Sequence, residues 1–196
     1  MTGARTDESI QLRDGRTLFF AEYGRPAGRP VVWFHGLPGS RLDLSTGAGP
    51  ALISELGLRV LAPDRPGFGR SDAHRGRSYG SFTQDVRELV DACQLDRFVA
   101  LAYSGGAAYA LACAATIGDR VESVGIVSGA GPRSTPAFSK GMWRTDKLML
   151  PLSRWMPAGA RAALRAAARD VRRQPEKFLR TLRKDLSASP HDVELL

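Results

Sequence analysis

Near the middle of the sequence, in the segment Ala102-Tyr103-Ser104-Gly105-Gly106, a serine is followed by two glycines and has an alanine two residues before it. An apolar run precedes this segment and an alanine-rich run follows it, which predicts a tight strand-to-helix turn with Ser104 at its tip. Such a turn lifts the hydroxyl group above the sheet edge, and the free N–H groups at the helix start favour a negatively charged oxygen. The chemistry that this pattern predicts is nucleophilic attack by a serine on a carbonyl carbon.

Two further loops rich in glycine and proline follow predicted strands. The segment His35-Gly36-Leu37-Pro38-Gly39-Ser40 comes directly after a short apolar run, and its turn can aim a backbone N–H group at the space above Ser104. The second loop covers residues 64–72 and also follows an apolar run. Because the carboxyl ends of parallel strands lie at one edge of a sheet, we expect all three segments at that edge.

Ser104 has a second interpretation, as part of a glycine-rich turn that binds phosphate. The turn lacks the lysine and the spacing of a P-loop, and the sequence contains no G-x-G-x-x-G motif, so this interpretation is disfavoured. Cys93 and Cys113 fall in predicted helices with no clustered His or Cys, and we interpret both as small buried apolar residues. The sequence therefore predicts no cofactor and no metal site.

The elements that must position these loops begin with a hairpin, because residues 9–13 and 17–23 flank the turn signal Asp14-Gly15. Strands and helices then alternate along the chain. The expected strands are 31–34, 58–62, 98–102 and 121–127, and the expected helices are 49–56, 81–93 and 106–117. This alternation predicts an α/β domain with a mostly parallel sheet after an opening hairpin.

The character of the sequence changes after Gly129. Residues 138–196 show helical periodicity and no strand pattern, and prolines divide them into shorter pieces. We therefore expect an α/β core over residues 1–132 and a helical domain over residues 133–196.

Together, the three motifs resemble those of the α/β-hydrolase superfamily in their order, their spacing and their positions after strands. The resemblance covers about residues 8–131, and residues 138–196 are similar to the helical cap that many members insert after the sixth strand. It implies the α/β-hydrolase fold, with Ser104 as the catalytic nucleophile. It also implies that the backbone N–H groups of Leu37 and Gly105 form the oxyanion hole.

The resemblance implies structural roles for two other residues of these motifs. His35 is expected to support its loop rather than act as the catalytic base, and Asp64 is expected to fix the turn that follows it. Ala102 departs from the family pattern, since it replaces the first glycine of G-x-S-x-G, but it is still a small residue.

The catalytic acid and histidine of the superfamily have no match in this sequence. Family members continue after the cap with further strands, whose loops supply first the acid and then the histidine. His191 lies in a polar segment and His74 in a polar loop, so neither fits the role. We expect the last strands to be missing, the cap to be partial and the 196-residue chain to be nearly inactive, because a serine without a positioned base is a poor nucleophile.

The charge distribution bears on the partners of the protein. The formal net charge is +8, but the excess is concentrated in the helical tail, where ten Lys and Arg face five Asp and Glu from residue 151 onward. We interpret this arginine-rich run as the solvated face of helices, since few aromatic residues interleave it, and we expect neither nucleic acid nor membrane as a partner. The polar N-terminus and the lack of a long apolar run predict a cytoplasmic protein.

The expected partner is thus a small-molecule substrate, and the leading hypothesis is a hydrolase that acts on an ester or similar small acyl compound. Dehalogenases and epoxide hydrolases of this superfamily are disfavoured because they carry Asp where Ser104 stands. The alternative hypothesis is a non-catalytic binding protein that uses the shortened fold or its basic helical tail. In either case the apolar strand 121–127 would be an open sheet edge, so that we expect self-association or marginal stability.

Overall fold

The computed structural model describes residues 4–129 and 144–185. The chain divides into two compact units, residues 1–130 and residues 131–196. The predicted boundary between residues 132 and 133 lies outside the described residues.

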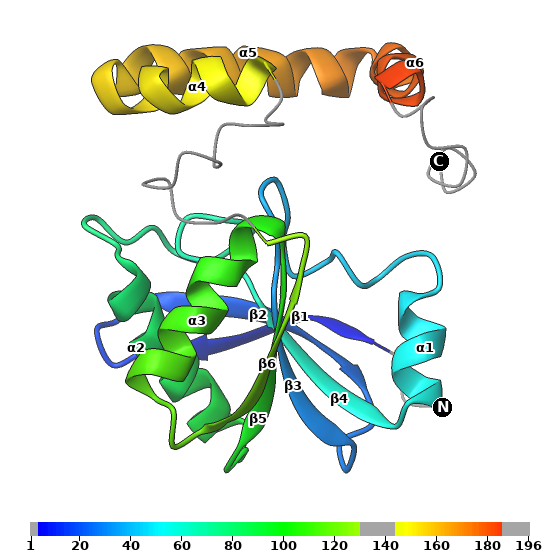
Figure 1. Ribbon diagram of the computed structural model, residues 1–196, viewed down its shortest axis with the longest axis vertical. Coiled ribbons are helices and arrows are strands. Elements are labelled where there is room, and N and C mark those ends of the chain that lie inside the picture. The colour runs from blue at the N-terminus through cyan, green and yellow to red at the C-terminus, as the bar shows by residue number, and fades with distance from the viewer. Residues whose placement is uncertain (1–3, 130–143, 186–196) are drawn as a thin grey trace. The chain divides into compact units, whose positions relative to one another are not determined.

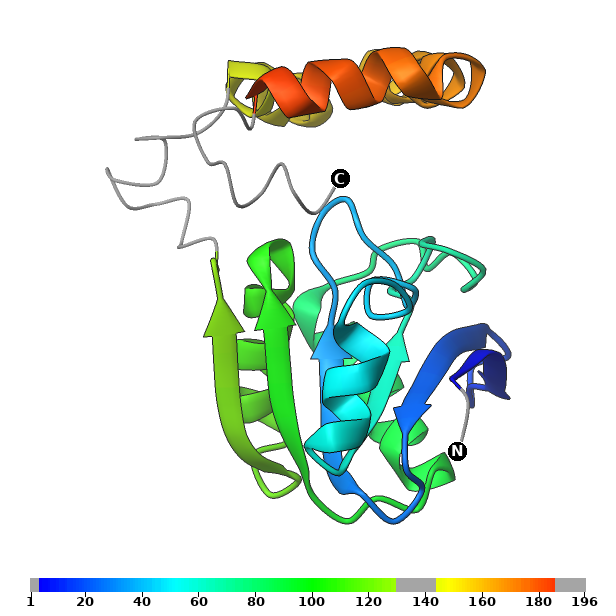
Figure 2. The same cartoon turned by 90° about the vertical axis from the view of Figure 1, so that its right-hand side faces the viewer.

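The first unit is built on a six-stranded sheet with the order β1-β2-β4-β3-β5-β6 (Figures 1 and 2). β1 and β2 form the predicted antiparallel hairpin, although β1 begins at Arg5 and ends at Gln11 rather than covering residues 9–13. β2 also pairs antiparallel with β4. The strands β4, β3, β5 and β6 are parallel to one another. The strands are β1 (Arg5–Gln11), β2 (Thr17–Gly24), β3 (Arg29–Phe34), β4 (Leu58–Pro63), β5 (Phe98–Tyr103) and β6 (Val121–Val127). This arrangement confirms the predicted α/β fold with a mostly parallel sheet.

Helices cover both faces of this sheet (Figure 1). α2 (Tyr79–Ala92) and α3 (Ala107–Thr116) lie on one face, and α1 (Gly49–Glu55) lies on the other. The larger core fills the space under α2 and α3, where Phe82 is almost fully buried and packs edge-on against Phe34. Burying a side chain of this size stabilises the fold by about 2–3 kcal/mol.

The start of α2 differs from the sequence-based expectation of residue 81. The side chain of Ser78 accepts a hydrogen bond from the Ser81 amide at 3.0 Å, and the Ser81 hydroxyl accepts one from the Ser78 amide at 2.9 Å. These reciprocal bonds form a capping box with serine in the place of the usual Glu or Gln. The helix therefore begins at Tyr79, one turn before its first buried apolar residue.

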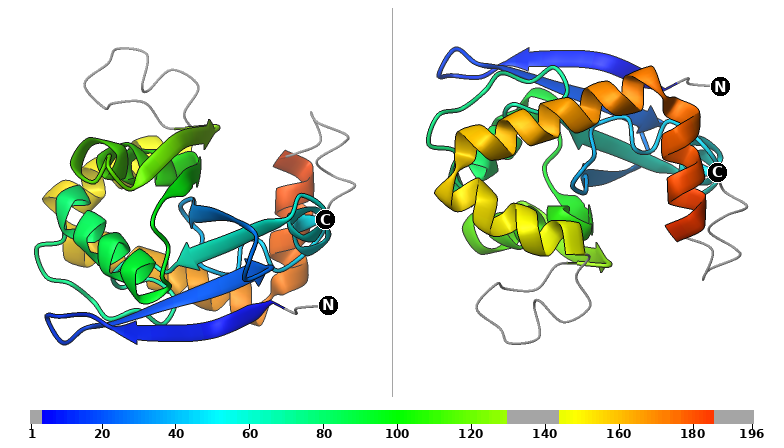
Figure 3. Two further views of the ribbon diagram at one scale, coloured as in Figure 1. Left: turned by 90° about the horizontal axis from the view of Figure 1, so that it is seen from below. Right: turned by 90° about the horizontal axis from the view of Figure 1, so that it is seen from above.

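The described part of the second unit, residues 144–185, consists of three helices, α4 (Arg144–Trp155), α5 (Pro157–Arg173) and α6 (Pro175–Asp185), joined at sharp bends (Figure 3). Pro157 and Pro175 each occupy the first helical position, where the missing N–H group is not needed. Pro151, in contrast, lies inside α4 rather than at a helix boundary. Every side chain from residue 161 to residue 173 is exposed. None of the helices in the described parts of the chain is apolar enough over a sufficient length to cross a membrane.

Candidate active site

Ser104 lies immediately after β5, as the first residue of a short 3-10 turn (Ser104–Gly106) that leads into α3. Its φ angle is +49°, in the left-handed region that non-glycine residues rarely adopt. Holding a residue in this conformation costs about 1–2 kcal/mol. A strained serine between a strand and a helix is the local geometry of a nucleophile elbow, which exposes the hydroxyl group at the sheet edge.

The loop after β3 packs directly against this turn. A side-chain carbon added to Gly106 would stand 2.0 Å from the Phe34 carbonyl oxygen, so that only glycine lets the turn approach the end of β3. A side-chain carbon added to Gly105 would stand 3.6 Å from the amide nitrogen of Leu37. These glycines bring the loop backbone and the serine turn into contact.

The three residues predicted to form the nucleophile and the oxyanion hole therefore lie together. Ser104 and Gly105 are consecutive at the start of the turn, and the Leu37 amide lies beside them. Among the described residues, the Leu37 N–H group donates to no acceptor and the Ser104 hydroxyl forms no hydrogen bond. The arrangement leaves a serine hydroxyl group and a free amide donor at one edge of the sheet.

His35 is fully buried beside this edge and is engaged through both ring nitrogens. Its Nε2 atom accepts a hydrogen bond from the Arg65 amide at 3.3 Å, so that Nδ1 carries the proton and donates to the Gly36 carbonyl at 3.0 Å. Burial lowers the pKa of His35 to about 4, with a smaller effect from the Arg65 charge. Buried and doubly bonded, His35 supports the loop and is not available as a catalytic base.

The neutral state of His35 predicts a pH dependence of stability. The folded-state pKa of about 4 lies below the ordinary value of 6.5, so the unfolded chain binds a proton that the folded chain excludes. Stability is therefore fully present above about pH 6.5 and falls by about 3 kcal/mol as the pH is lowered to about 4. Urea unfolding across this range would measure it, and the variant His35→Asn should show a flatter dependence. Equal slopes in the two proteins would contradict the prediction.

Asp64 follows β4 and fixes the third predicted loop. Its carboxylate accepts hydrogen bonds from the Arg41 amide at 2.7 Å, the Arg41 guanidinium at 2.8 Å and the Arg70 amide at 3.2 Å. Both Asp64 and Arg41 are buried. The carboxylate thus ties the 64–72 loop to the chain after β3, which agrees with the structural role expected for Asp64.

Arg65 is a residue of this region that the sequence pattern did not single out. It is 4% exposed and donates two hydrogen bonds to the backbone of the loop that carries Leu37. No feature of the sequence distinguishes it from the other arginines of the same motif, because its burial depends on how three separate loops meet.

The acid and base of a catalytic triad are not found in the described residues. His74 is half-buried in the loop after the third motif, and His191 lies outside the described residues. Residues 4–129 and 144–185 contain no group of three or more His, Cys, Asp or Glu side chains placed to hold a metal ion.

Comparison with known proteins identifies the family. The family model described as alpha/beta hydrolase fold matches residues 29–189. The chain is 32% identical over 126 residues to a non-heme chloroperoxidase of Streptomyces lividans, covering 63% of this chain and 45% of that protein. It is 30% identical over 154 residues to a proline iminopeptidase of Heyndrickxia coagulans, covering 72% of this chain and 47% of that protein.

Among solved structures, an esterase from Exiguobacterium antarcticum aligns with a TM-score of 0.61 and 25% identity, covering 78% of this chain and 57% of that chain. The present chain spans less than half the length of the two curated relatives described above. The six-stranded sheet, the strained serine turn and the family match agree with one another. The chain therefore belongs to the α/β-hydrolase fold family.

Proposed function

We propose that Ser104 is the nucleophile of a serine hydrolase that acts on an ester or a similar small acyl substrate. The observation that carries the proposal is the left-handed conformation of Ser104 at the end of β5, with the Leu37 amide free beside it. That geometry presents an oxygen nucleophile and amide donors to the same small volume.

The proposed reaction begins when Ser104 Oγ attacks the carbonyl carbon and the carbonyl π electrons move onto oxygen. The N–H groups of Leu37 and Gly105 would bind this oxyanion, and the start of α3 adds the favourable end of a helix dipole. Collapse of the tetrahedral intermediate releases the alcohol and leaves an acyl group on Ser104, which water then hydrolyses. The serine proton must pass to a base, which returns it to the departing alkoxide to form the alcohol, and the described residues position no such base at Ser104.

The relatives are named for different activities. We therefore infer the substrate class from the proposed serine nucleophile and from the likeness to an esterase. A serine forms an acyl-enzyme with esters and with amides, and esters need less assistance because an alcohol leaves more readily than an amine. The likeness to an esterase at 25% identity favours the same choice.

A covalent trap tests this proposal without requiring turnover. The 196-residue chain would be incubated with a fluorophosphonate probe over a series of imidazole concentrations, with free imidazole standing in for a positioned base. We expect a single adduct on the peptide that contains Ser104, formed faster as imidazole increases. Labelling of other serines, or none at any imidazole concentration, would refute the proposal.

A second candidate function is non-catalytic binding through the basic helices. Two observations favour it: the continuous exposure of residues 161–173 and the lack of a positioned base within the described residues. The same trap separates the two functions, because a binding protein would not acquire the adduct. That the protein binds neither nucleic acid nor membrane, and that it is cytoplasmic, stay predictions of the sequence.

Self-association through β6 is a further expectation. β6 is the last strand in the sheet order, and its residues Ile126 and Val127 are 42% and 51% exposed. An exposed apolar edge strand favours pairing with another chain. Sedimentation velocity should show species larger than a monomer that decrease in the variant Ile126→Lys. A monomeric protein with cooperative, high-temperature unfolding would contradict this expectation.

A further inference from the structure

Arg65 is a buried cation without a carboxylate partner. It is 4% exposed, and the ion pairs formed within the described residues do not include it. Arg41, the other buried arginine, is paired with Asp64 at 2.8 Å. Burying an unpaired charge is costly unless other polar groups replace water around it. The groups that surround Arg65 therefore indicate which part of the structure the buried charge stabilises.

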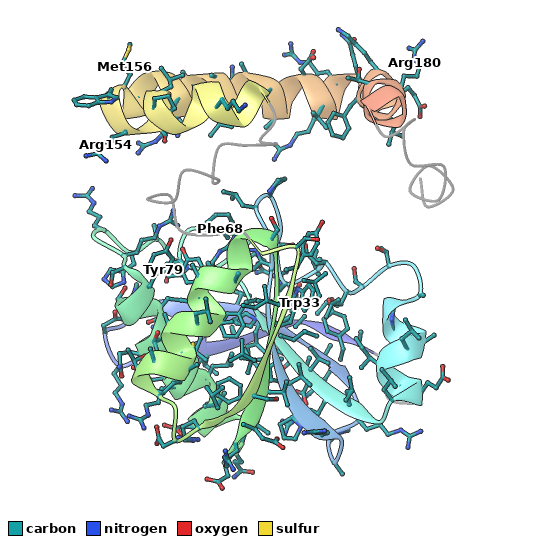
Figure 4. The ribbon with its side chains drawn as sticks, in the orientation of Figure 1. Trp33, Phe68, Tyr79, Arg154, Met156 and Arg180 are labelled. Atoms are coloured by element: carbon teal, nitrogen blue, oxygen red, sulfur yellow. The ribbon has the colours of Figure 1, made fainter. Side chains whose placement is uncertain are left out.

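The guanidinium of Arg65 binds the loop that follows β3. Nη1 donates to the His35 carbonyl oxygen at 2.8 Å, and Nη2 donates to the Gly36 carbonyl oxygen at 2.6 Å. Its central carbon lies 4.7 Å from the ring centroid of Phe68 and 5.0 Å from that of Tyr109, which is on α3. Phe68 is labelled in Figure 4. Arg65 thus connects the 64–72 loop, the loop after β3 and the helix after Ser104.

The Gly36 carbonyl and the Leu37 N–H group belong to one planar peptide unit. The Gly36 oxygen accepts two hydrogen bonds, from Arg65 Nη2 and from His35 Nδ1. Two donors on this oxygen fix the rotation of the peptide plane and therefore the direction of its N–H group. A donor on the carbonyl side also polarises the peptide, which makes the N–H on the other side a stronger donor. A cationic donor has a larger effect than a neutral one.

We propose that Arg65 is a positioning residue of the oxyanion hole, which orients and polarises the Leu37 N–H group through the Gly36 carbonyl. The proposal rests on the proposed function, since it needs Leu37 to bind the oxyanion. Arg65 itself does not touch the substrate. Its charge polarises the Gly36–Leu37 peptide unit, whose N–H group is the one that would contact the substrate.

Arg77 provides a matched control. Its guanidinium lies over the same Phe68 ring, at 5.4 Å, and donates to the Pro66 carbonyl at 2.7 Å. Arg77 therefore stabilises the same loop without a hydrogen bond to the loop that carries Leu37. The variants Arg65→Met and Arg77→Met each remove one positive charge that contacts the 64–72 loop, but only the first removes the donors to residues 35 and 36.

The sequence permits a direct measurement on the Leu37 amide. It contains two Gly-Leu peptide bonds, Gly36–Leu37 and Gly57–Leu58. Labelling glycine with ¹³C at the carbonyl and leucine with ¹⁵N selects these two amides in a carbonyl-filtered NMR spectrum. Leu58 is the first residue of β4 and serves as an internal reference for folding.

We expect Arg65→Met to move the Leu37 amide signal upfield while the Leu58 signal stays in place, and Arg65→Lys to restore part of the difference. Arg77→Met should leave both signals unchanged. If Arg65→Met does not fold, Arg65→Lys takes its place in the test. We then expect the Leu37 signal to move further in Arg65→Lys than in Arg77→Met. A Leu37 signal that stays at its native position in Arg65→Met, or in Arg65→Lys where Arg65→Met does not fold, would overturn the proposal.

Fluorophosphonate labelling completes the test. Removing an oxyanion donor altogether costs about 10²–10³-fold, so weakening the Leu37 donor in Arg65→Met should slow labelling of Ser104 by about tenfold. Unchanged labelling in Arg65→Met would also overturn the role of Arg65. If Arg65→Met displaces the Leu37 signal but the native chain forms no Ser104 adduct, the proposed function fails. Arg65 would then polarise the Leu37 amide without a role in catalysis.

Discussion

The variant Ser104→Ala is expected to lose the covalent adduct at residue 104 entirely, at every imidazole concentration. The alanine has no oxygen to attack the probe, and the Leu37 and Gly105 amides alone form no covalent bond. In a serine protease with a Ser-His-Asp triad, the loss of the nucleophile lowers turnover by about 10⁶-fold. Intact-protein mass and peptide mapping after a fixed incubation would measure the loss.

Ser128 offers the matched control for this substitution. It also follows a parallel strand, and its φ angle is also +49°, so that alanine meets the same backbone strain there. The variant Ser128→Ala should label as rapidly as the native chain. Equal loss of labelling in both variants would mean that strain or unfolding, rather than the Ser104 hydroxyl, controls the reaction.

The variant Asp64→Ala is expected to lose about 3–5 kcal/mol of unfolding free energy. The substitution removes three hydrogen bonds and leaves the buried guanidinium of Arg41 without its partner. A typical domain has about 5–15 kcal/mol in total, so the loss is a large fraction of the free energy of unfolding. Urea unfolding monitored by circular dichroism would give the change in midpoint.

Asp7 separates the effect of burial from the effect of charge. It pairs with the same Arg41 guanidinium at 2.5 Å, but its side chain is 61% exposed. Water compensates for the loss of an exposed partner, so Asp7→Ala should leave the unfolding midpoint almost unchanged. Equal destabilisation of the two variants would contradict the prediction that burial makes the loss of Asp64 costly.

Much of the fold could be predicted from the sequence because its signals are local. The Asp14-Gly15 turn placed the opening hairpin, and short apolar runs placed the four parallel strands within two residues of their ends. The strand-to-helix turn at Ser104 followed from the small residues on either side of it. Each of these features depends on neighbouring residues, which is why the sequence pattern was sufficient.

Features that depend on distant parts of the chain could not be predicted in this way. Arg65 and Arg70 stand in the same motif, yet Arg65 is buried and Arg70 is exposed. Only the meeting of α3 with two loops makes the buried position. The pairing of Arg41 with Asp64 likewise joins segments that no periodicity relates. The start of α2 was missed because a serine took the place of the acidic or amide residue usual in a capping box.

The strand order of the sheet has a consequence for folding kinetics. Leu37 follows β3 and Ser104 follows β5, and the two strands are neighbours in the sheet although α1, β4 and α2 separate them along the chain. Their pairing must close a long loop, which costs conformational entropy and raises the contact order of the domain. Both effects slow folding. Ser104 and the Leu37 amide therefore come together only when β3 and β5 pair in the sheet. A partly collapsed intermediate that holds the hairpin and the helices would still lack the reactive site.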